Sequence, residues 1–321
     1  MKLSIVLPVY NNQETLHPLI SGLHREFSLL RGDWEIIAVD DGSKDSSWAQ
    51  IQKAVRQFKN VVGMRHSRNF GQHPAILTGV QAAQGDFVLV MDSDFQDQPS
   101  DARHLYLKAR TGWDVVQGKR IFRKDRWIVR WRSRFFHRLF LLLSGIQTNS
   151  EVANFCVYSR RTVSAYLSCP EQNKIMCLFV KLLGFRQTSI AVEHRPRTHG
   201  QSGYSWWGLC RLAGLAIFHH SKIPLYFGII LGFCASLSAG AAGIWILGQK
   251  FFHHIKVPGW ASLGVLLTFL SGTMFLIVGI LGLYIGLVLD EIRSRPQAVV
   301  SEVCRPGPKQ RKRLHIPKRI I

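Results

Sequence analysis

The sequence predicts an α/β domain with a parallel-rich central sheet, followed by a C-terminal hairpin of two transmembrane helices. Three short apolar runs alternate with helix-like stretches, which is typical of parallel strands buried on both faces. In chain order these segments cover 3–9, 14–32, 35–39, 44–58, 71–84 and 86–91. The hairpin is predicted by 223–248 and 257–289, which hold no charged residue and exceed the ~20 apolar residues that a span needs.

Each apolar run of the predicted sheet ends in a polar cluster. These clusters lie at 10–12, 40–43 and 92–94. Ligands of open α/β sheets bind at the carboxyl ends of the strands. We therefore expect the three clusters to meet at one site, although they are far apart in the sequence.

Charge and cysteine content narrow the class of protein. The net charge is +21, with 41 Lys and Arg against 20 Asp and Glu, which calls for an anionic partner. The basic residues crowd next to apolar stretches, which favours anionic membrane lipids. No nucleic-acid-binding signature accompanies the charge, so nucleic acid is not expected as a partner. The six cysteines form no CxxC pair, which indicates free thiols in a reducing compartment.

The segments around the predicted spans indicate how the chain meets the membrane. Segment 119–144 interleaves Arg and Lys with aromatic residues and predicts an amphipathic interfacial helix, and 205–222 predicts a second one. Pro8 interrupts the first apolar run too early for a signal peptide, so we expect 1–204 to be a cytosolic domain. The basic tail, 290–321, then also lies in the cytosol and is expected to stay unfolded until it meets lipid. Glycines in the first span favour close helix packing, which permits a homo-oligomer.

Two acidic clusters carry the predicted chemistry. Asp92 and Asp94 follow a buried strand at a spacing that lets them share one Mg²⁺ or Mn²⁺ ion with substrate phosphates. Asp40 and Asp41 can accept hydrogen bonds from a nucleotide base or a ribose hydroxyl. Ser43 is expected to cap the following helix.

Several motifs in this order give the chain a recognisable resemblance. They read LPVYNN at 7–12, VDDGSKD at 39–45, SRNFGQ at 67–72, GxxxAxxxG at 71–79, MDSDFQDQP at 91–99 and RxxGxSxY at 197–204. Together they resemble the family-2 glycosyltransferases, and more narrowly the polyisoprenyl-phosphate branch. That branch includes dolichol-phosphate mannose synthase and bacterial undecaprenyl-phosphate glycosyltransferases. The QxxRW motif of processive polysaccharide synthases is absent.

The resemblance implies a GT-A type nucleotide-diphospho-sugar transferase domain, a divalent metal and inversion at the anomeric carbon. It assigns Asp92 and Asp94 to the metal. Candidate catalytic residues are Asp94, Asp97 and Asn154. Candidates for nucleotide-sugar binding are Pro8, Tyr10, Asn11, Asn12, Asp40, Asp41, Asp92, Ser93, Gln96 and Arg120. Candidates for phosphate or acceptor binding are Arg134, Arg197, Ser202 and Tyr204.

Four positions depart from the family pattern. Asn12 replaces a usual Glu, Ser93 a usual Ala, Gly203 a frequent Lys, and Asn154 an Asp that is sometimes assigned as a base. The acceptor phosphate has a second pKa of ~6, so it is mostly dianionic in the cytosol and needs no strong base. We expect Asn154 to orient a phosphate oxygen instead.

The predicted function is metal-dependent transfer of a sugar from a nucleotide-sugar, with UDP the expected nucleotide, to undecaprenyl phosphate at the inner face of a bacterial membrane. The product would serve cell-envelope glycan, lipid A or O-antigen modification. Two alternatives remain open. One is an inactive membrane scaffold on the same fold, and the other is a transferase acting on a different acceptor, such as diacylglycerol or a soluble glycan.

Overall fold

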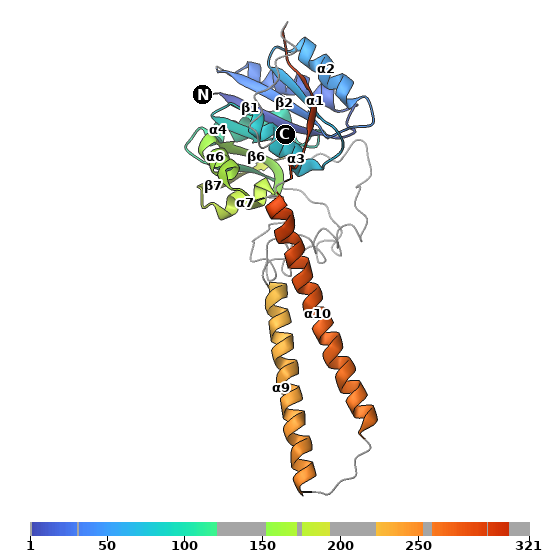
Figure 1. Ribbon diagram of the computed structural model, residues 1–321. Helices are drawn as coiled ribbons and strands as arrows, with labels where there is room; N and C mark the ends of the chain where they lie inside the picture. The colour runs from blue at the N-terminus through green and yellow to red at the C-terminus, as the bar shows by residue number, and fades with distance from the viewer. Residues whose placement is uncertain are drawn as a thin grey trace, which may run out of the picture. The chain divides into compact units, whose positions relative to one another are not determined.

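The computed structural model describes residues 2–30, 32–120, 152–171, 175–192, 223–252, 259–293 and 295–307 (Figure 1). The chain divides into two compact units. The first combines Met1–Ser133, Thr148–Ser202 and Arg295–Ile321, and the second combines Arg134–Gln147 and Gly203–Ser294. Segment 205–222 and most of 119–144, together with Arg134, Arg197, Ser202 and Tyr204, lie outside the described residues.

The first unit is built on a mixed sheet in which the described residues supply eight strands. The spatial order is β7-β5-β6-β4-β1-β2-β3-β8. Pairs β1–β2, β1–β4, β2–β3 and β5–β7 are parallel, and the remaining pairs are antiparallel. The strands are β1 Leu3–Val9, β2 Trp34–Asp40, β3 Val61–His66, β4 Phe87–Val90, β5 Val115–Arg120, β6 Val152–Ser159, β7 Gln187–Val192 and β8 Val300–Cys304.

Helices cover both faces of this sheet. They are α1 Leu16–Ser28, α2 Ser47–Gln57, α3 Gln72–Ala82, α4 Pro99–Ala109, α6 Arg160–Ser168 and α7 Met176–Leu182. Successive side chains of a strand point to opposite faces, so β1 feeds two cores. Ile5 and Leu7 belong to the core that includes α1, α2 and α4, while Val6 belongs to the core that includes α3, α6 and α7. Burial on both faces confirms the interpretation of the apolar runs.

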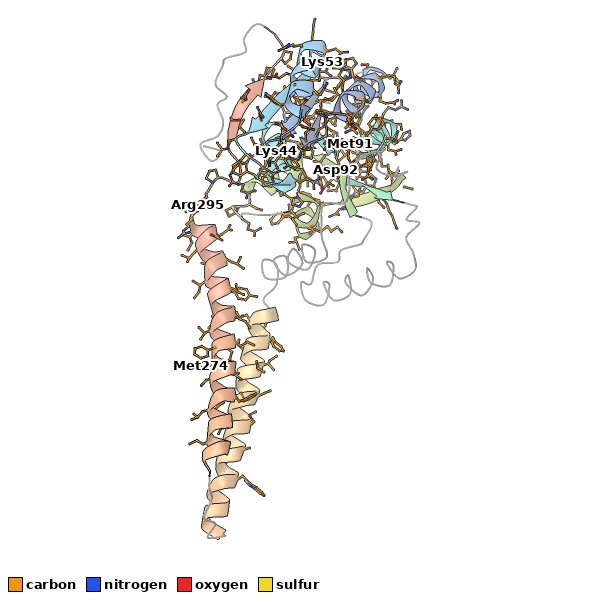
Figure 2. All side chains as sticks on the ribbon, turned by 90° about the vertical axis from the view of Figure 1, so that its right-hand side faces the viewer. Lys44, Lys53, Met91, Asp92, Met274 and Arg295 are labelled. Carbon is orange, nitrogen blue, oxygen red and sulfur yellow. The ribbon has the colours of Figure 1, made fainter. Side chains whose placement is uncertain are left out.

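The second unit contains two long apolar helices, α9 (Ile223–Phe252) and α10 (Trp260–Arg293), which lie side by side (Figure 1). A Cβ added at Gly232 of α9 would lie 3.1 Å from Ile277 of α10, so the glycine allows a close approach. Among the described residues one segment, Phe269–Arg293, meets the length and composition of a membrane span. Its side chains are open to the surroundings: Met274, marked in Figure 2, is 67% exposed, and Phe275 is 76% exposed.

The expectation of an unfolded tail is wrong for the part that the structure describes. Val300–Cys304 forms β8, which pairs antiparallel with β3 and places Glu302 opposite Arg65. The sequence VVSEVC carries β-branched residues that favour a strand. The basic residues that follow dominate the average composition of the tail, and for this reason this short strand was not predicted from the sequence.

Candidate functional site

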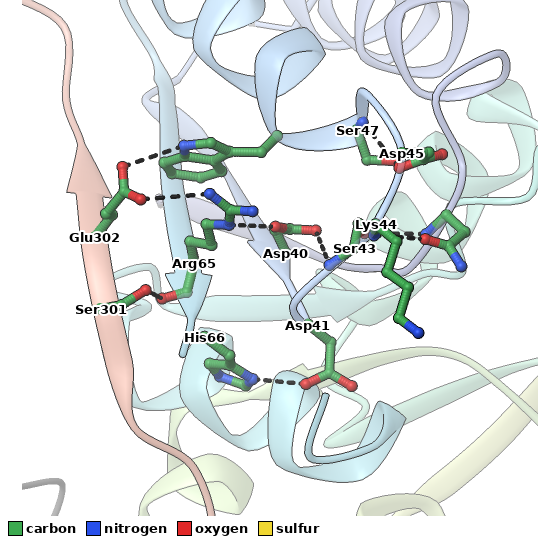
Figure 3. A network of polar contacts seen from close by, with 12 residues as sticks. Asp40, Asp41, Ser43, Lys44, Asp45, Ser47, Arg65, His66, Ser301 and Glu302 are labelled. Atoms are coloured by element: carbon green, nitrogen blue, oxygen red, sulfur yellow. Dashed lines mark hydrogen bonds and ion pairs between the residues drawn. The ribbon is translucent and has the colours of Figure 1, made fainter. Parts of the chain in front are cut away.

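The loops that follow β1 and β2 are joined into one structure. The Asn11 backbone N–H donates to Ser43 Oγ at 3.0 Å, and the Lys44 N–H donates to Asn11 Oδ1 at 2.9 Å (Figure 3). Asn11 has a φ of 52°, a left-handed conformation that asparagine tolerates better than most residues. Ser43 therefore holds the β1 loop. The expectation that it caps the next helix is wrong, because the residue at the N-cap of α2 is Ser46.

A second set of contacts joins the same loops further along the chain. The Gln13 N–H donates to Asp45 Oδ2 at 3.1 Å, and the Asn12 N–H donates to Ser47 Oγ at 2.8 Å. Asp45 Oδ1 also accepts from the Ser47 N–H at 3.0 Å. The predicted nucleotide-binding residues Asn11 and Asn12 are thus fixed through their backbone by the loop that follows Asp40.

Asp40 is a buried carboxylate whose two oxygens differ in their contacts with the described residues. Its side chain is 0% exposed, and Oδ1 accepts from the Ser43 N–H at 3.2 Å. Arg65 Nε lies 3.2 Å from Oδ2, close enough for an ion pair, yet its direction is not that of a hydrogen bond. Burial raises the pKa of Asp40 above its ordinary value, while Ser43 and the Arg65 cation act in the opposite direction. Among the described residues, Oδ2 therefore receives no hydrogen bond.

Asp41, the next residue, has its oxygens engaged by the protein. Oδ1 lies 2.8 Å from His66 Nδ1 and accepts from the Phe70 N–H at 2.9 Å, and Oδ2 accepts from the Gly71 N–H at 2.7 Å. His66 in turn contacts Thr78 Oγ1 through Nε2 at 3.0 Å. These contacts indicate that Asp41 holds the 67–71 loop in place.

Gly42 brings that loop close to the end of β2. Its φ is +67°, and an added Cβ would lie 2.5 Å from the carbonyl carbon of Arg68. Only glycine fits such a position, because a side chain would meet rigid backbone. Gly42 therefore allows the backbone of Arg68 to approach closely, in addition to forming the turn.

The segment after β4 is anchored to β1. Ser93 Oγ donates to the Pro8 carbonyl at 2.8 Å, and Thr15 Oγ1 donates to the Ser93 carbonyl at 2.8 Å. Asp92 Oδ1 accepts from Gln72 Nε2 at 2.7 Å. Ser93, which departs from the family pattern, thus fixes the turn that carries the two carboxylates Asp92 and Asp94 (Figure 2 marks Asp92).

The backbone beyond Asp94 turns sharply. The Gln96 N–H donates to Asp94 Oδ1 at 3.2 Å, and Phe95 has a φ of 61°. A positive φ in an aromatic residue is uncommon and is found mainly where surrounding structure enforces it. Asp97, just beyond, is buried. The strained turn therefore sets the direction of both Asp94 and Asp97.

The strand order brings the acidic clusters together. β1 lies between β2 and β4, and all three run parallel, so Asp40 and Asp92 follow strands whose carboxyl ends share one edge. Tyr10 at the end of β1 is 42% exposed at this edge. Asn154 lies on β6, next to β4, and Arg120 ends β5. The convergence predicted from the sequence is confirmed for these clusters.

A divalent metal fits the chemistry of the donor set. Asp92 and Asp94 supply hard carboxylate oxygens on one anchored turn, and Mg²⁺ and Mn²⁺ prefer such ligands together with phosphate oxygens. Within the described part of the chain, no group of three or more His, Cys, Asp or Glu side chains gathers as a self-sufficient metal site. Two carboxylates on one turn leave the other coordination positions of such an ion to water and substrate phosphates.

Sequence reasoning missed three polar residues near the site: Arg65, His66 and Glu302. Arg65 and His66 end β3, whose apolar start, VVGM at 61–64, would have predicted a further strand with polar residues at its carboxyl end. Glu302 gave no comparable signal, because its partners lie more than 230 residues away in the sequence.

Comparison with known proteins gives three findings. The model of the family described as glycosyl transferase family 2 matches residues 4–167. A Synechocystis protein named uncharacterized glycosyltransferase sll0501 is 32% identical over 94% of this chain and 96% of its own. Glucosyl-3-phosphoglycerate synthase from Mycobacterium tuberculosis, solved with Mn²⁺ and UDP-glucose, is 18% identical, with a TM-score of 0.50 over 68% of this chain and 77% of its own. The last likeness concerns the fold, which is the GT-A type α/β fold.

Proposed function

Because the chain belongs to glycosyl transferase family 2 and is a glycosyltransferase, we propose that it transfers a sugar from a nucleotide-sugar to polyisoprenyl phosphate at the inner face of a bacterial membrane. The observation that carries the donor assignment is Asp40 Oδ2, a buried carboxylate oxygen that receives no hydrogen bond from the described residues, at the edge that also bears Asp92 and Asp94. A nucleotide base N–H satisfies such an oxygen, and a diphosphate suits the carboxylate-bound metal.

In this proposal Asp40 binds the base, with UDP the first nucleotide to test. Pro8, Tyr10 and Asn11 line the same edge beside it. Asp41 and Ser93 act through the loops that they hold. The remaining donor contacts that we propose come from Asn12, Gln96 and Arg120, and the phosphate or acceptor contacts from Arg134, Arg197, Ser202 and Tyr204.

Asp92 and Asp94 would hold the Mg²⁺ or Mn²⁺ ion, which supplies charge neutralisation for the leaving diphosphate. An acceptor phosphate oxygen attacks the anomeric carbon, the bond from that carbon to the diphosphate breaks, and its electron pair leaves with the nucleoside diphosphate. The acceptor is mostly dianionic above pH ~6, so positioning matters more than deprotonation. Asn154 on β6 would orient the phosphate, and Asp97 would support the turn at the metal.

The order of elements along the chain supports a membrane hairpin. α9 and α10 come between β7 and β8, and both strands belong to one sheet. A sheet lies on one side of a membrane, so a chain that leaves and rejoins it crosses an even number of times. If α10 crosses through Phe269–Arg293, another crossing is required, and α9, uncharged from 223 to 248, fits it.

This hairpin motivates the choice of a lipid acceptor. The exposed apolar side chains of α10 form a surface suited to acyl chains, and a polyisoprenyl phosphate keeps its chain in the bilayer while its phosphate remains accessible from the cytosol. The chain's +21 charge suits both anionic headgroups and the lipid phosphate. We propose a multi-pass protein of the bacterial inner membrane, with glycines in α9 permitting a homo-oligomer.

The test uses the full chain in detergent with undecaprenyl phosphate and a panel of radiolabelled nucleotide-sugars, with Mg²⁺ or Mn²⁺ and in parallel with EDTA. We expect label from one donor to enter the organic extract, and EDTA and Asp94→Ala to abolish it. The matched control is Asp33→Ala, an exposed carboxylate just before β2, at the other end of the strands.

Three results would contradict parts of the proposal. If label appears only with diacylglycerol, the proposed acceptor is wrong and the proposed donor stands. If activity is unchanged in EDTA, the reaction does not depend on a metal. No transfer from any donor, combined with no binding of UDP or GDP by calorimetry, favours the inactive scaffold.

A further inference from the structure

The C-terminal strand β8 contacts a residue at the candidate donor site. Glu302 Oε2 accepts from Trp48 Nε1 at 3.3 Å, and Oε1 accepts from Arg65 Nη1 at 3.4 Å (Figure 3). Ser301 Oγ donates to the Arg65 carbonyl at 3.1 Å. Both the backbone and the guanidinium of Arg65 are therefore held by a strand that follows α10.

The guanidinium of Arg65 connects two carboxylates that differ in burial. Its Nε lies 3.2 Å from Oδ2 of Asp40, which is 0% exposed, and its Nη1 lies 3.4 Å from Oε1 of Glu302, which is 51% exposed. The Trp48 ring lies beside it, with 5.8 Å from the Arg65 Cζ to the ring centroid. An arginine presents its donors in a fixed planar fork, so holding one end of the guanidinium sets the direction of the other.

We propose that Glu302 is a positioning residue for donor binding, which fixes the Arg65 guanidinium against Asp40 so that Asp40 presents Oδ2 to the nucleotide base. This inference rests on the proposed function, since it gives Asp40 a role with the nucleotide. It adds a residue from beyond the apolar helices to the donor site.

The geometry favours positioning over a purely structural role. An ion pair as exposed as that between Glu302 and Arg65 contributes little to folding by itself. The ion pair instead restricts the rotamers of Arg65, whose side chain is 33% exposed and could otherwise turn toward solvent. Without Glu302, Asp40 loses a fixed cation on one side and retains Ser43 on the other, so the carboxylate is less well oriented for a ligand.

The experiment measures UDP and GDP affinity by calorimetry, with Mn²⁺, on the full chain in detergent. The variants are Glu302→Gln, Arg65→Met and the double substitution. The matched control is Glu26→Gln, which removes an equivalent ion pair between α1 and α4, at 3.3 Å from Arg103 Nε. Melting temperatures are recorded for all of them.

We expect Glu302→Gln to weaken nucleotide affinity about two- to fivefold, the range of a half-exposed ion pair, while Glu26→Gln leaves it unchanged. Glu302→Asp, which keeps the charge on a shorter side chain, is expected to fall between wild type and Glu302→Gln. The double variant should bind no more weakly than Arg65→Met, because Glu302 acts only through Arg65. A lower melting temperature alone would not produce this pattern.

The inference would be overturned if Glu302→Gln left nucleotide affinity unchanged, or if the affinity losses of the two single variants added in the double variant. In either case the proposed function would stand, provided that the wild-type chain binds nucleotide. A wild-type chain that binds neither UDP nor GDP would overturn both.

Discussion

The buried chain Asp41–His66–Thr78 leads to a prediction about stability. His66 is 1% exposed, and its two ring nitrogens lie 2.8 Å from Asp41 and 3.0 Å from Thr78. His66→Phe preserves the ring shape but removes both contacts. Asp41, an acceptor only, loses a charge-assisted bond of about 1.5–3 kcal/mol, and the buried Thr78 hydroxyl loses a bond of about 1 kcal/mol.

The sum is about 2.5–4 kcal/mol, and a ring of similar size leaves little cavity that would add to it. At about 2–4 °C per kcal/mol for a domain of this size, the melting temperature should fall by roughly 5–16 °C. Thr78→Val removes only one contact and should cost about 1–2 kcal/mol. Added to His66→Phe, it should cost almost nothing more, because the hydroxyl has already lost its partner.

The assay is thermal unfolding of the full chain in detergent, followed by intrinsic fluorescence. The matched control is His17→Phe, since His17 carries one exposed contact, to Gln57 at 3.0 Å. A melting temperature for His66→Phe within 2 °C of wild type, roughly the effect of a single weak contact, would refute the view that this chain holds the 67–71 loop. Strict additivity with Thr78→Val would refute the coupling.

Three further predictions concern the site. Ser93→Ala should cost about 1 kcal/mol in the free energy of unfolding and slow transfer, because its 2.8 Å bond to the β1 carbonyl is lost; urea unfolding and turnover check this. Gly42→Ala should destabilise by at least about 1 kcal/mol, since it combines a φ of +67° with a backbone clash; an unchanged melting temperature would contradict it. Burial raises the pKa of Asp40, and the Arg65 cation acts in the opposite direction. Nucleotide affinity should therefore fall as the pH drops through that pKa and Asp40 becomes protonated, and Arg65→Met should move this fall to higher pH. Calorimetry across a pH series tests the direction of both effects.

The sequence predicted the elements whose signal is local. β1, β2 and β4 are apolar runs with polar ends, and their convergence follows from the geometry of a parallel sheet. Asp40 was recognised because a carboxylate after a buried strand is chemically conspicuous. These predictions needed only neighbours within a few residues.

Other features depend on contacts between distant segments. Asp40 and Asp41 look alike in the sequence, yet in the described part of the chain Asp40 Oδ2 receives no hydrogen bond, whereas Asp41 is held by His66 and the 67–71 loop. Glu302 finds Arg65 across 237 positions, through a strand hidden in a basic tail. These roles depend on burial and on pairing between distant segments, and neither can be read from the periodicity of a single sequence.

The position of β8 has a consequence for how the molecule is made. β3 gains its outer neighbour only when residues 300–304 emerge, after both apolar helices have been synthesised. Until then β3 presents unpaired backbone groups, which readily pair with other chains and promote aggregation. Pairing of β8 with β3 therefore follows synthesis of both apolar helices, and it requires that the chain between β7 and β8 has returned to the sheet. A chain shortened before Val300 should be prone to aggregate and to be degraded during synthesis, even with every residue of the acidic clusters intact.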